Sequence, residues 1–269
     1  MNNLKNLEKL AGYRDFTAPD FVGTWACEEM VLPLKVNWKL SRNETLSKTN
    51  FLIKYQREGK QYLGEVAPNI RYGESSDKIK SDFALFVKDF SYIHSMECAS
   101  ALKAGIYGCL WDQVKEQFIS LTPYSVPTSF SIPIMDPSEM QNYLLQNTPF
   151  PFYKLKVNAE LALDLVKEYF KYSDKPLRVD GNEAWDKPED VISFLEKTKS
   201  FPIAILEQPM PAKLDGAMPE IKKRASMSIY ADESITANPD WIKLKENFDG
   251  VNVKIMKAGG IFASAKQIT

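Results

Sequence analysis

The sequence predicts an α/β protein in which a (β/α) barrel with parallel strands follows a smaller α+β domain. From about residue 128 onward, short apolar runs alternate with segments whose apolar residues recur every three or four positions, which is typical of βαβ units. The first 120 residues instead show a hairpin pattern followed by two helix patterns. We therefore expect the α+β domain over residues 1–120 and the barrel domain over residues 121–269.

The N-terminal domain is expected to contain an antiparallel hairpin and two helices. Residues 51–68, FLIKYQREGKQYLGEVAP, form two strand-like runs around a charged turn that contains glycine, and this is a strong hairpin signal. The segments around 75–90 and 95–119 carry apolar residues at helical spacing.

The barrel domain is expected to contain six strands separated by amphipathic helices. The strand candidates are TSFSIPI (128–134), YKLKV (153–157), LRVD (177–180), IAILEQP (203–209), SIYADE (228–233) and GVNVKIM (250–256). The helix candidates include AELALDLVKEYFKY (159–172), KPEDVISFLEKTKS (187–200) and NPDWIKLKENF (238–248).

Charged residues at the strand ends favour a barrel over an open, doubly wound sheet. The functional groups of a barrel lie at the carboxyl ends of several strands. Here Lys156, Asp180, Glu207, Asp232 and Lys254 each fall near the end of a different strand candidate. No glycine-rich phosphate loop follows the first strand, which weakens the nucleotide-binding open-sheet alternative.

The composition argues against several classes of partner and favours a cytoplasmic protein. The chain has 34 basic and 35 acidic residues, so nothing favours binding to nucleic acid or to an anionic membrane. The apolar runs are far shorter than the ~18 residues of a membrane span, and the N-terminus has no apolar signal core. The three cysteines match no zinc or redox spacing, and the single histidine, His94, has no catalytic pattern around it. Acid–base chemistry must therefore use lysines, carboxylates or a metal.

Three acids on consecutive strand candidates predict a magnesium site. Asp180, Glu207 and Asp232 are separated by 27 and 25 residues, and each step is one strand-to-strand unit of a barrel. Three converging carboxylates cannot all stay ionised without a counter-charge, and an all-oxygen set with open positions suits Mg²⁺. Each acid taken alone is compatible with an ordinary strand end, but three in consecutive register favour the metal.

Lysines on two strand candidates are the predicted acid–base groups. Lys154 and Lys156 are two residues apart, so their side chains share one face of a strand. A lysine beside another cation loses its proton more easily, so Lys154 would let Lys156 act as a base near neutral pH. Lys254 lies one strand after Asp232, and the second and sixth strands lie on opposite sides of a barrel mouth. In isolation, YKLKV is also compatible with an edge strand that carries two solvated lysines.

The motifs YKLKV, LRVDGNEAW, AILEQP, YADES and GVNVKIMKAGG, in this order, resemble the enolase superfamily, and specifically its muconate-lactonizing subgroup. The resemblance spans roughly residues 20–269. It implies an enolase-type, TIM-like barrel and an N-terminal capping domain whose loops close over the barrel mouth. It also implies Mg²⁺ ligands at Asp180, Glu207 and Asp232, and an acid/base pair of Lys156 and Lys254 supported by Lys154.

Within that subgroup, NVKIMKAGG is most similar to the dipeptide epimerases. The resemblance implies removal of the proton α to a carboxylate, a metal-stabilised enediolate, and return of a proton by the second lysine. The substrate would be a dipeptide such as L-Ala-L-Glu, or another small carboxylate with an acidic α-proton. Asn182 and Glu233 would lie beside the metal ligands, and Arg42 is the candidate for a substrate-binding residue of the first capping loop. The sequence leaves a homo-oligomer open.

Two departures from the family pattern keep other functions open. The chain stops at IFASAKQIT, after the sixth strand, so we expect the last strand units of the barrel to be missing from it. The spacings from Lys156 to Asp180 and from Asp232 to Lys254, 24 and 22 residues, resemble those of o-succinylbenzoate synthases. Those enzymes are dehydrating lyases with the same lysines and metal. A non-catalytic, truncated barrel protein is the third hypothesis.

Overall fold

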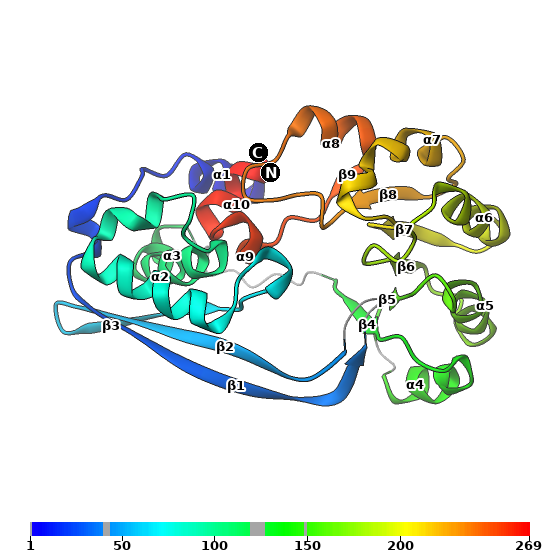
Figure 1. The fold of residues 1–269 in the computed structure, drawn as a ribbon, viewed down its shortest axis with the longest axis horizontal. Helices are drawn as coiled ribbons and strands as arrows, with labels where there is room; N and C mark the ends of the chain where they lie inside the picture. The colour runs from blue at the N-terminus through cyan, green and yellow to red at the C-terminus, as the bar shows by residue number, and fades with distance from the viewer. Residues whose placement is uncertain (1, 40–43, 119–126, 148–149) are drawn as a thin grey trace. The chain divides into compact units, whose positions relative to one another are not determined.

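The computed structural model describes residues 2–39, 44–118, 127–147 and 150–269 (Figure 1). The chain divides into two compact units. The first unit comprises residues 1–33, 47–123 and 253–269, and the second comprises residues 34–46 and 124–252. The chain thus passes between the units more than once, whereas the sequence predicted a single boundary after residue 120.

The first unit contains the predicted hairpin within a three-stranded sheet of order β1-β2-β3. Its strands are β1 (Thr24–Lys39), β2 (Glu44–Arg57) and β3 (Lys60–Val66). Strands β2 and β3 pair antiparallel, and Arg57 lies opposite Lys60 across the turn. The two turn residues, Glu58 and Gly59, have φ values of 51° and 74°. A two-residue loop with positive φ at both positions matches the twist of the flanking strands, which confirms the hairpin prediction.

Helices pack against this sheet and against one another, and together with the strands they form the apolar core of the first unit. The helices are α1 (Asn2–Ala11), α2 (Ser76–Lys88), α3 (Ser100–Val114), α9 (Ile255–Ala258) and α10 (Ile261–Ile268). Helix α3 packs directly on β3. This close approach depends on Gly64 and Gly105, because a Cβ on Gly64 would overlap the carbonyl oxygen of Gly105.

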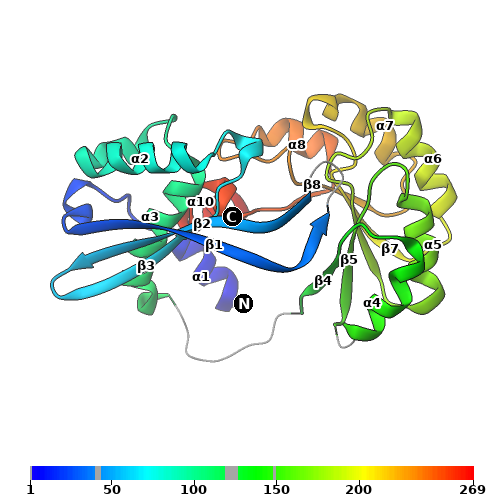
Figure 2. The ribbon, with the colours of Figure 1, turned by 60° about the horizontal axis from the view of Figure 1, so that its bottom comes forward.

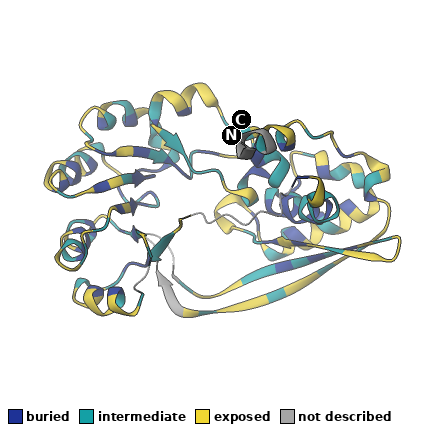
Figure 3. Cartoon of the chain, turned by 180° about the vertical axis from the view of Figure 1, so that it is seen from behind, coloured by how far each residue is buried: buried dark blue, intermediate teal, exposed yellow. Residues whose placement is uncertain are grey.

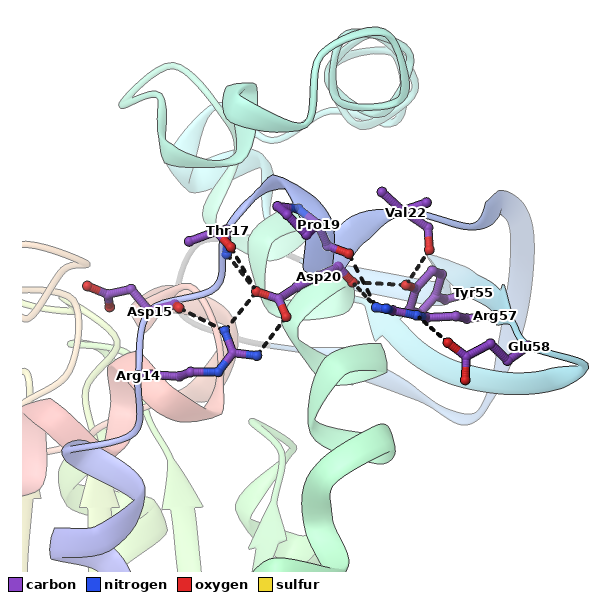
Figure 4. Close-up of polar contacts among 9 residues, drawn as sticks. All are labelled: Arg14, Asp15, Thr17, Pro19, Asp20, Val22, Tyr55, Arg57 and Glu58. Carbon is purple, nitrogen blue, oxygen red and sulfur yellow. Dashed lines mark hydrogen bonds and ion pairs between the residues drawn. The ribbon is translucent and has the colours of Figure 1, made fainter.

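The segment that leads into β1 is tied down by a polar network (Figure 4). The Asp20 carboxylate accepts two hydrogen bonds from the Arg14 guanidinium, at 2.6 and 2.8 Å, and a third from the Thr17 backbone N–H at 2.8 Å. On β2, the Tyr55 hydroxyl lies 2.9 Å from the backbone oxygens of both Asp20 and Val22. These contacts hold the chain in place before it enters the sheet.

The second unit contains a parallel sheet of six strands in sequential order. Its strands are β4 (Ser129–Ile132), β5 (Phe152–Lys156), β6 (Leu177–Asp180), β7 (Ile203–Glu207), β8 (Ser228–Ala231) and β9 (Gly250–Val251). Each strand pairs in parallel with the next strand along the chain. Sequential order is that of a (β/α) barrel, whereas the order of a doubly wound sheet reverses at a switch point. The α/β prediction is therefore confirmed.

The helices of the second unit are α4 (Met140–Gln146), α5 (Ala162–Tyr172), α6 (Pro188–Thr198), α7 (Met218–Lys222) and α8 (Trp241–Asn247). Helices α4, α5 and α6 follow the same face of the sheet in both views (Figure 2). Their sides toward the strands are buried and the opposite sides are exposed (Figure 3). In α5, for example, Tyr169 packs edge-on against Tyr153 of β5, with ring centroids 5.9 Å apart. Apolar residues at helical spacing therefore face the sheet, as the pattern predicted.

Short 3₁₀ turns complete the connections: η1 (Ala18–Phe21), η2 (Ile70–Tyr72), η3 (Phe90–His94), η4 (Lys115–Gln117), η5 (Pro137–Glu139) and η6 (Ala212–Ala217). Among the helices in the described residues, none combines the length and hydropathy that crossing a bilayer requires.

The last predicted strand, 250–256, is wrong in its extent. Strand β9 ends at Val251, and residues 255–258 form helix α9 with Lys254 at its N-cap. The sequence Ile-Met-Lys-Ala favours helix, and Gly259, at a φ of 88°, ends it in the left-handed conformation that glycine adopts readily. Met256 also packs against the apolar core of the first unit, so burial stabilises this helix.

Candidate functional site

The candidate site lies at the carboxyl ends of strands β5 to β8, within the second unit. Lys156 is level with Asp180 across the β5–β6 pair, and Asp180 is level with Glu207 across the β6–β7 pair. Asp232 directly follows Ala231, the last residue of β8. Since neighbouring parallel strands end at the same edge of a sheet, these side chains meet there.

The three predicted metal ligands come together in the structure. Asp180, Glu207 and Asp232 each place a carboxylate oxygen within 4.8 Å of the others. All three residues are buried, with exposed fractions of 0%, 4% and 1%. A buried set of oxygen ligands is the chemistry that a hard divalent cation such as Mg²⁺ prefers.

Lys154 and Lys156 point at these acids from the same face of β5. The Lys154 ammonium lies 2.7 Å from Asp180 Oδ2 and 2.6 Å from Glu207 Oε2. The Lys156 ammonium lies 2.5 Å from Asp180 Oδ2 and donates a hydrogen bond to Asn182 Oδ1 at 2.8 Å. Both lysine side chains are mostly buried, so the solvated edge-strand alternative for YKLKV is wrong.

The charges in this cluster shift one another's protonation. Burial by itself lowers the pKa of Lys154, but the carboxylates of Asp180 and Glu207 outweigh burial and hold that pKa above its usual value. Burial alone would raise the pKa of Asp180, yet the two ammonium groups hold it below the usual value. Burial and the charge of Asp180 raise the pKa of Glu207 to about 7, in spite of Lys154. The cluster therefore keeps Lys154 charged and leaves Glu207 poised near neutral pH.

One carboxylate oxygen of the cluster has a further property that is expected of a metal ligand. Among the residues that the structure describes, Glu207 Oε1 is buried and has no hydrogen-bond partner. A buried acceptor without a donor is unfavourable, because it has lost water and gained nothing in return. A bound cation would satisfy this oxygen, so the residues present fit a metal.

Asn182 and Glu233 lie beside the acids. The Asn182 backbone N–H donates to Asp180 Oδ1 at 3.0 Å, and its side-chain amide donates to Glu233 Oε1 at 3.1 Å. Asn182 has a φ of 44°, in the left-handed region that asparagine tolerates better than most residues. This turn directs the Asn182 side chain toward both Lys156 and Glu233.

Sequence reasoning missed two buried polar residues of this edge, Glu183 and Gln208. The Glu183 side chain accepts a hydrogen bond from the Ala212 backbone N–H at 3.0 Å. The Gln208 carboxamide contacts the residues that follow β8. The only signal for Gln208 was its position directly after Glu207, and the position alone does not indicate where the carboxamide points.

Two predicted residues are not placed with this cluster. Lys254 belongs to the first compact unit, at the N-cap of α9. Arg42 lies outside the described residues. Their predicted roles as second base and substrate-binding residue are not tested by this geometry.

Residues 139–269 match the protein family described as enolase C-terminal domain-like. Among curated proteins, the chain is similar to an L-Ala-D/L-amino acid epimerase of Flavobacterium johnsoniae, with 26% identity over 89% of this chain and 77% of the relative. It is also similar to an L-Ala-D/L-Glu epimerase of Escherichia coli, with 26% identity over 87% of this chain and 77% of the relative.

The fold is similar to that of a solved dipeptide epimerase from Enterococcus faecalis, complexed with Mg and the dipeptide L-Leu-L-Tyr. The TM-score is 0.82 at 23% identity, and the match covers 91% of this chain and 77% of the other. This likeness confirms the predicted enolase-type fold class.

Proposed function

Because this chain belongs to the enolase superfamily, we propose that it is an isomerase that epimerises dipeptides by removing and returning an α-proton. The curated relatives carry the names of epimerases that act on L-Ala dipeptides, so a dipeptide of the L-Ala-L-Glu class is the proposed substrate. The chain shares about a quarter of its residues with these relatives over most of its length.

The observation that carries the proposal is that two lysines contact carboxylates that could bind a metal, at one edge of the sheet. Lys156 lies against Asp180, and Lys154 bridges Asp180 and Glu207. A lysine can exchange a proton with a substrate carbon, and carboxylates can hold the cation that makes this proton acidic. Neither group alone supports removal of an α-proton at neutral pH.

Asp180, Glu207 and Asp232 would hold Mg²⁺ in this proposal. When bound, Mg²⁺ supplies positive charge that stabilises the negative charge developing on the substrate carboxylate as the α-proton leaves. The support for these ligands is their mutual proximity, their burial and the unsatisfied Glu207 Oε1.

Lys156 and Lys254 divide the proton transfer between them in this proposal, and Lys154 supports them. Lys156 exchanges the α-proton on one face of the substrate, and Asn182 orients its ammonium through a hydrogen bond. Burial lowers the pKa of Lys154, but the charges of Asp180 and Glu207 hold that pKa above its usual value. Lys154 therefore stays protonated and supplies positive charge beside these two acids. Lys254 serves the opposite face, an assignment supported by its place in GVNVKIMKAGG.

Deuterium exchange tests this function directly. The protein is incubated with L-Ala-L-Glu and Mg²⁺ in deuterated water, and the dipeptide is followed by NMR and by chiral chromatography. We expect deuterium at the α-carbon of the C-terminal residue together with the appearance of L-Ala-D-Glu. Lys156→Ala should abolish the appearance of L-Ala-D-Glu, whereas Lys171→Ala, which removes an exposed ammonium paired with Glu168, should leave both signals unchanged.

The alternatives give different outcomes in the same experiment. A dehydratase leaves every member of a small dipeptide library without deuterium but binds Mg²⁺. A non-catalytic protein also leaves every dipeptide without deuterium, and it does not bind Mg²⁺. Either result would overturn the epimerase proposal.

A further inference from the structure

We propose that Gln208 is a positioning residue that sets the place of Asp232 in the metal site by holding the backbone of residues 232–234. The inference rests on the proposed function, because it assumes that Asp232 is a ligand. Gln208 directly follows Glu207, and its side chain is fully buried. Gln208 thus connects the end of β7, which carries Glu207, with the end of β8, which Asp232 follows.

The carboxamide of Gln208 uses its full hydrogen-bonding capacity. Oε1 accepts from the backbone N–H groups of Asp232, at 2.9 Å, and of Ser234, at 3.1 Å. Nε2 donates to the Met210 carbonyl oxygen at 2.9 Å and to Ser234 Oγ at 2.8 Å. Two donors and two acceptor positions are what a carboxamide offers, so the group is saturated.

The partners of Gln208 select a carboxamide over other side chains. Backbone N–H groups can only donate, so an acceptor must face Asp232 and Ser234. The Met210 carbonyl can only accept, so a donor must face it. A carboxylate at position 208 would place acceptor against acceptor at Met210, and an apolar side chain would leave buried groups without partners.

The backbone of Gln208 also joins the strand ends that carry the acids. Its N–H donates to the Tyr230 carbonyl at 2.9 Å, and its carbonyl accepts from the Glu183 N–H at 2.8 Å. Its φ of 35° is unusual for a residue with a side chain. A Cβ on Gly181 would lie 2.9 Å from the Gln208 carbonyl oxygen, so this close approach needs glycine at position 181. Strained, fully bonded backbone of this kind occurs where a structure holds a site in one geometry.

Ser234 connects Gln208 to Asp215, an acid that is not among the three predicted metal ligands. Its hydroxyl accepts from Gln208 Nε2 and donates to Asp215 Oδ1 at 2.9 Å. The hydroxyl therefore anchors the donor end of the carboxamide, while the acceptor end holds Asp232. Removing the hydroxyl should loosen Gln208 without touching any of the three carboxylates.

Metal affinity tests the inference without any assay of activity. The full chain and its Gln208→Met variant are titrated with Mg²⁺ alone by calorimetry, well below the unfolding temperature of both. Groups that orient metal ligands typically change affinity by about 10–100-fold when replaced, and we expect a loss in this range. Thr198→Val is the matched control, since it removes a buried hydrogen bond to the Phe194 carbonyl within α6. It should lower stability and leave the Mg²⁺ affinity unchanged.

Substitutions at Ser234 keep the test decisive if Gln208→Met does not fold. Ser234→Ala should weaken Mg²⁺ binding, and Ser234→Thr, which keeps the hydroxyl, should restore it. If the wild type binds Mg²⁺ and the folded variants bind it with the same affinity, the role of Gln208 is overturned while the proposed function stands. If the wild type binds no divalent cation, both are overturned.

Discussion

Lys154 Nζ lies 2.6 Å from Glu207 Oε2, and the same nitrogen lies 2.7 Å from Asp180 Oδ2. One ammonium group thus pairs with two of the three buried acids at once. A buried charge that loses its partner is strongly destabilising, because water cannot replace the partner. Lys154 therefore supports the folded site as well as any chemistry there.

The first prediction concerns stability and its recovery by magnesium. Lys154→Met should lower the free energy of unfolding by about 3 kcal/mol without metal, since two buried carboxylates lose their common counter-charge. Mg²⁺ should restore part of this loss, because it supplies positive charge to the same oxygens. Urea unfolding of both proteins with and without Mg²⁺ measures the effect.

Lys171→Met is the matched control for that experiment. Its ion pair with Glu168 is exposed, so the loss should stay below about 0.5 kcal/mol and should not respond to Mg²⁺. A Lys154→Met variant that loses equal stability with and without Mg²⁺ would contradict the prediction.

The second prediction is a pH dependence of magnesium binding. Burial and the charge of Asp180 raise the pKa of Glu207 to about 7, so in the metal-free protein this carboxyl gains a proton as the pH falls below 7. A cation binds the ionised form, so the apparent affinity should fall by up to about tenfold for each pH unit below 7 and level off above 8. Titration calorimetry from about pH 5.5 to about 8.5 measures this dependence of the Mg²⁺ affinity. The same experiment should detect proton release when Mg²⁺ binds at about pH 6.

The third prediction uses Glu207→Gln, which removes the charge but almost no volume. The variant should fold, should bind Mg²⁺ at least about tenfold more weakly, and should lose turnover, because one of three charges on the ion is gone. The pH dependence between 6 and 8 should also disappear. Glu168→Gln, at a half-buried carboxylate that pairs with the exposed Lys171, is the control for charge removal. Unchanged affinity in Glu207→Gln would remove Glu207 from the site.

The fourth prediction separates the two proposed bases. If Lys156 and Lys254 work on opposite faces, Lys156→Ala should stop α-proton exchange from one epimer and Lys254→Ala should stop it from the other. Each loss should be about 10²–10⁴-fold, the usual contribution of a general base. Net epimerisation should be lost in both variants. Near wild-type exchange of both epimers in both variants would rule out the two-base mechanism.

The fifth prediction concerns the polar network of the first unit. The hydrogen bonds from Arg14 hold the pKa of Asp20 well below its usual value, against the opposing effect of burial. Its contribution to stability is therefore complete above the usual pKa and is lost as the pH falls through the lowered one. Asp20→Asn should destabilise the protein by about 1 kcal/mol at pH 7, and the difference from wild type should shrink below about pH 4. A difference that is constant down to pH 2 would contradict this explanation.

The local pattern of the sequence was sufficient to predict most elements of the fold. The turn at Glu58 and Gly59 determines the register of the hairpin locally, so no distant residue is needed to predict it. The alternation of strands and helices likewise predicts a parallel sheet, because both periods can be read from neighbouring residues. The strand near Lys254 was predicted too long, because its apolar residues continue past Val251; Ile-Met-Lys-Ala instead forms a helix, and half-buried Met256 packs against the apolar core of the first unit, to which this helix belongs.

The sequence by itself determined which groups reach the edge of the sheet: Asp180, Glu207 and Asp232 end or follow consecutive strands, and side chains two apart on a strand share a face. Only the tertiary structure decided which of these groups touch. Lys154 bridges two acids, and Gln208 holds the backbone of Asp232, because the register between strands brings them within hydrogen-bond distance. A contact across strands depends on the alignment of segments more than 20 residues apart, and no local preference of the chain encodes that alignment.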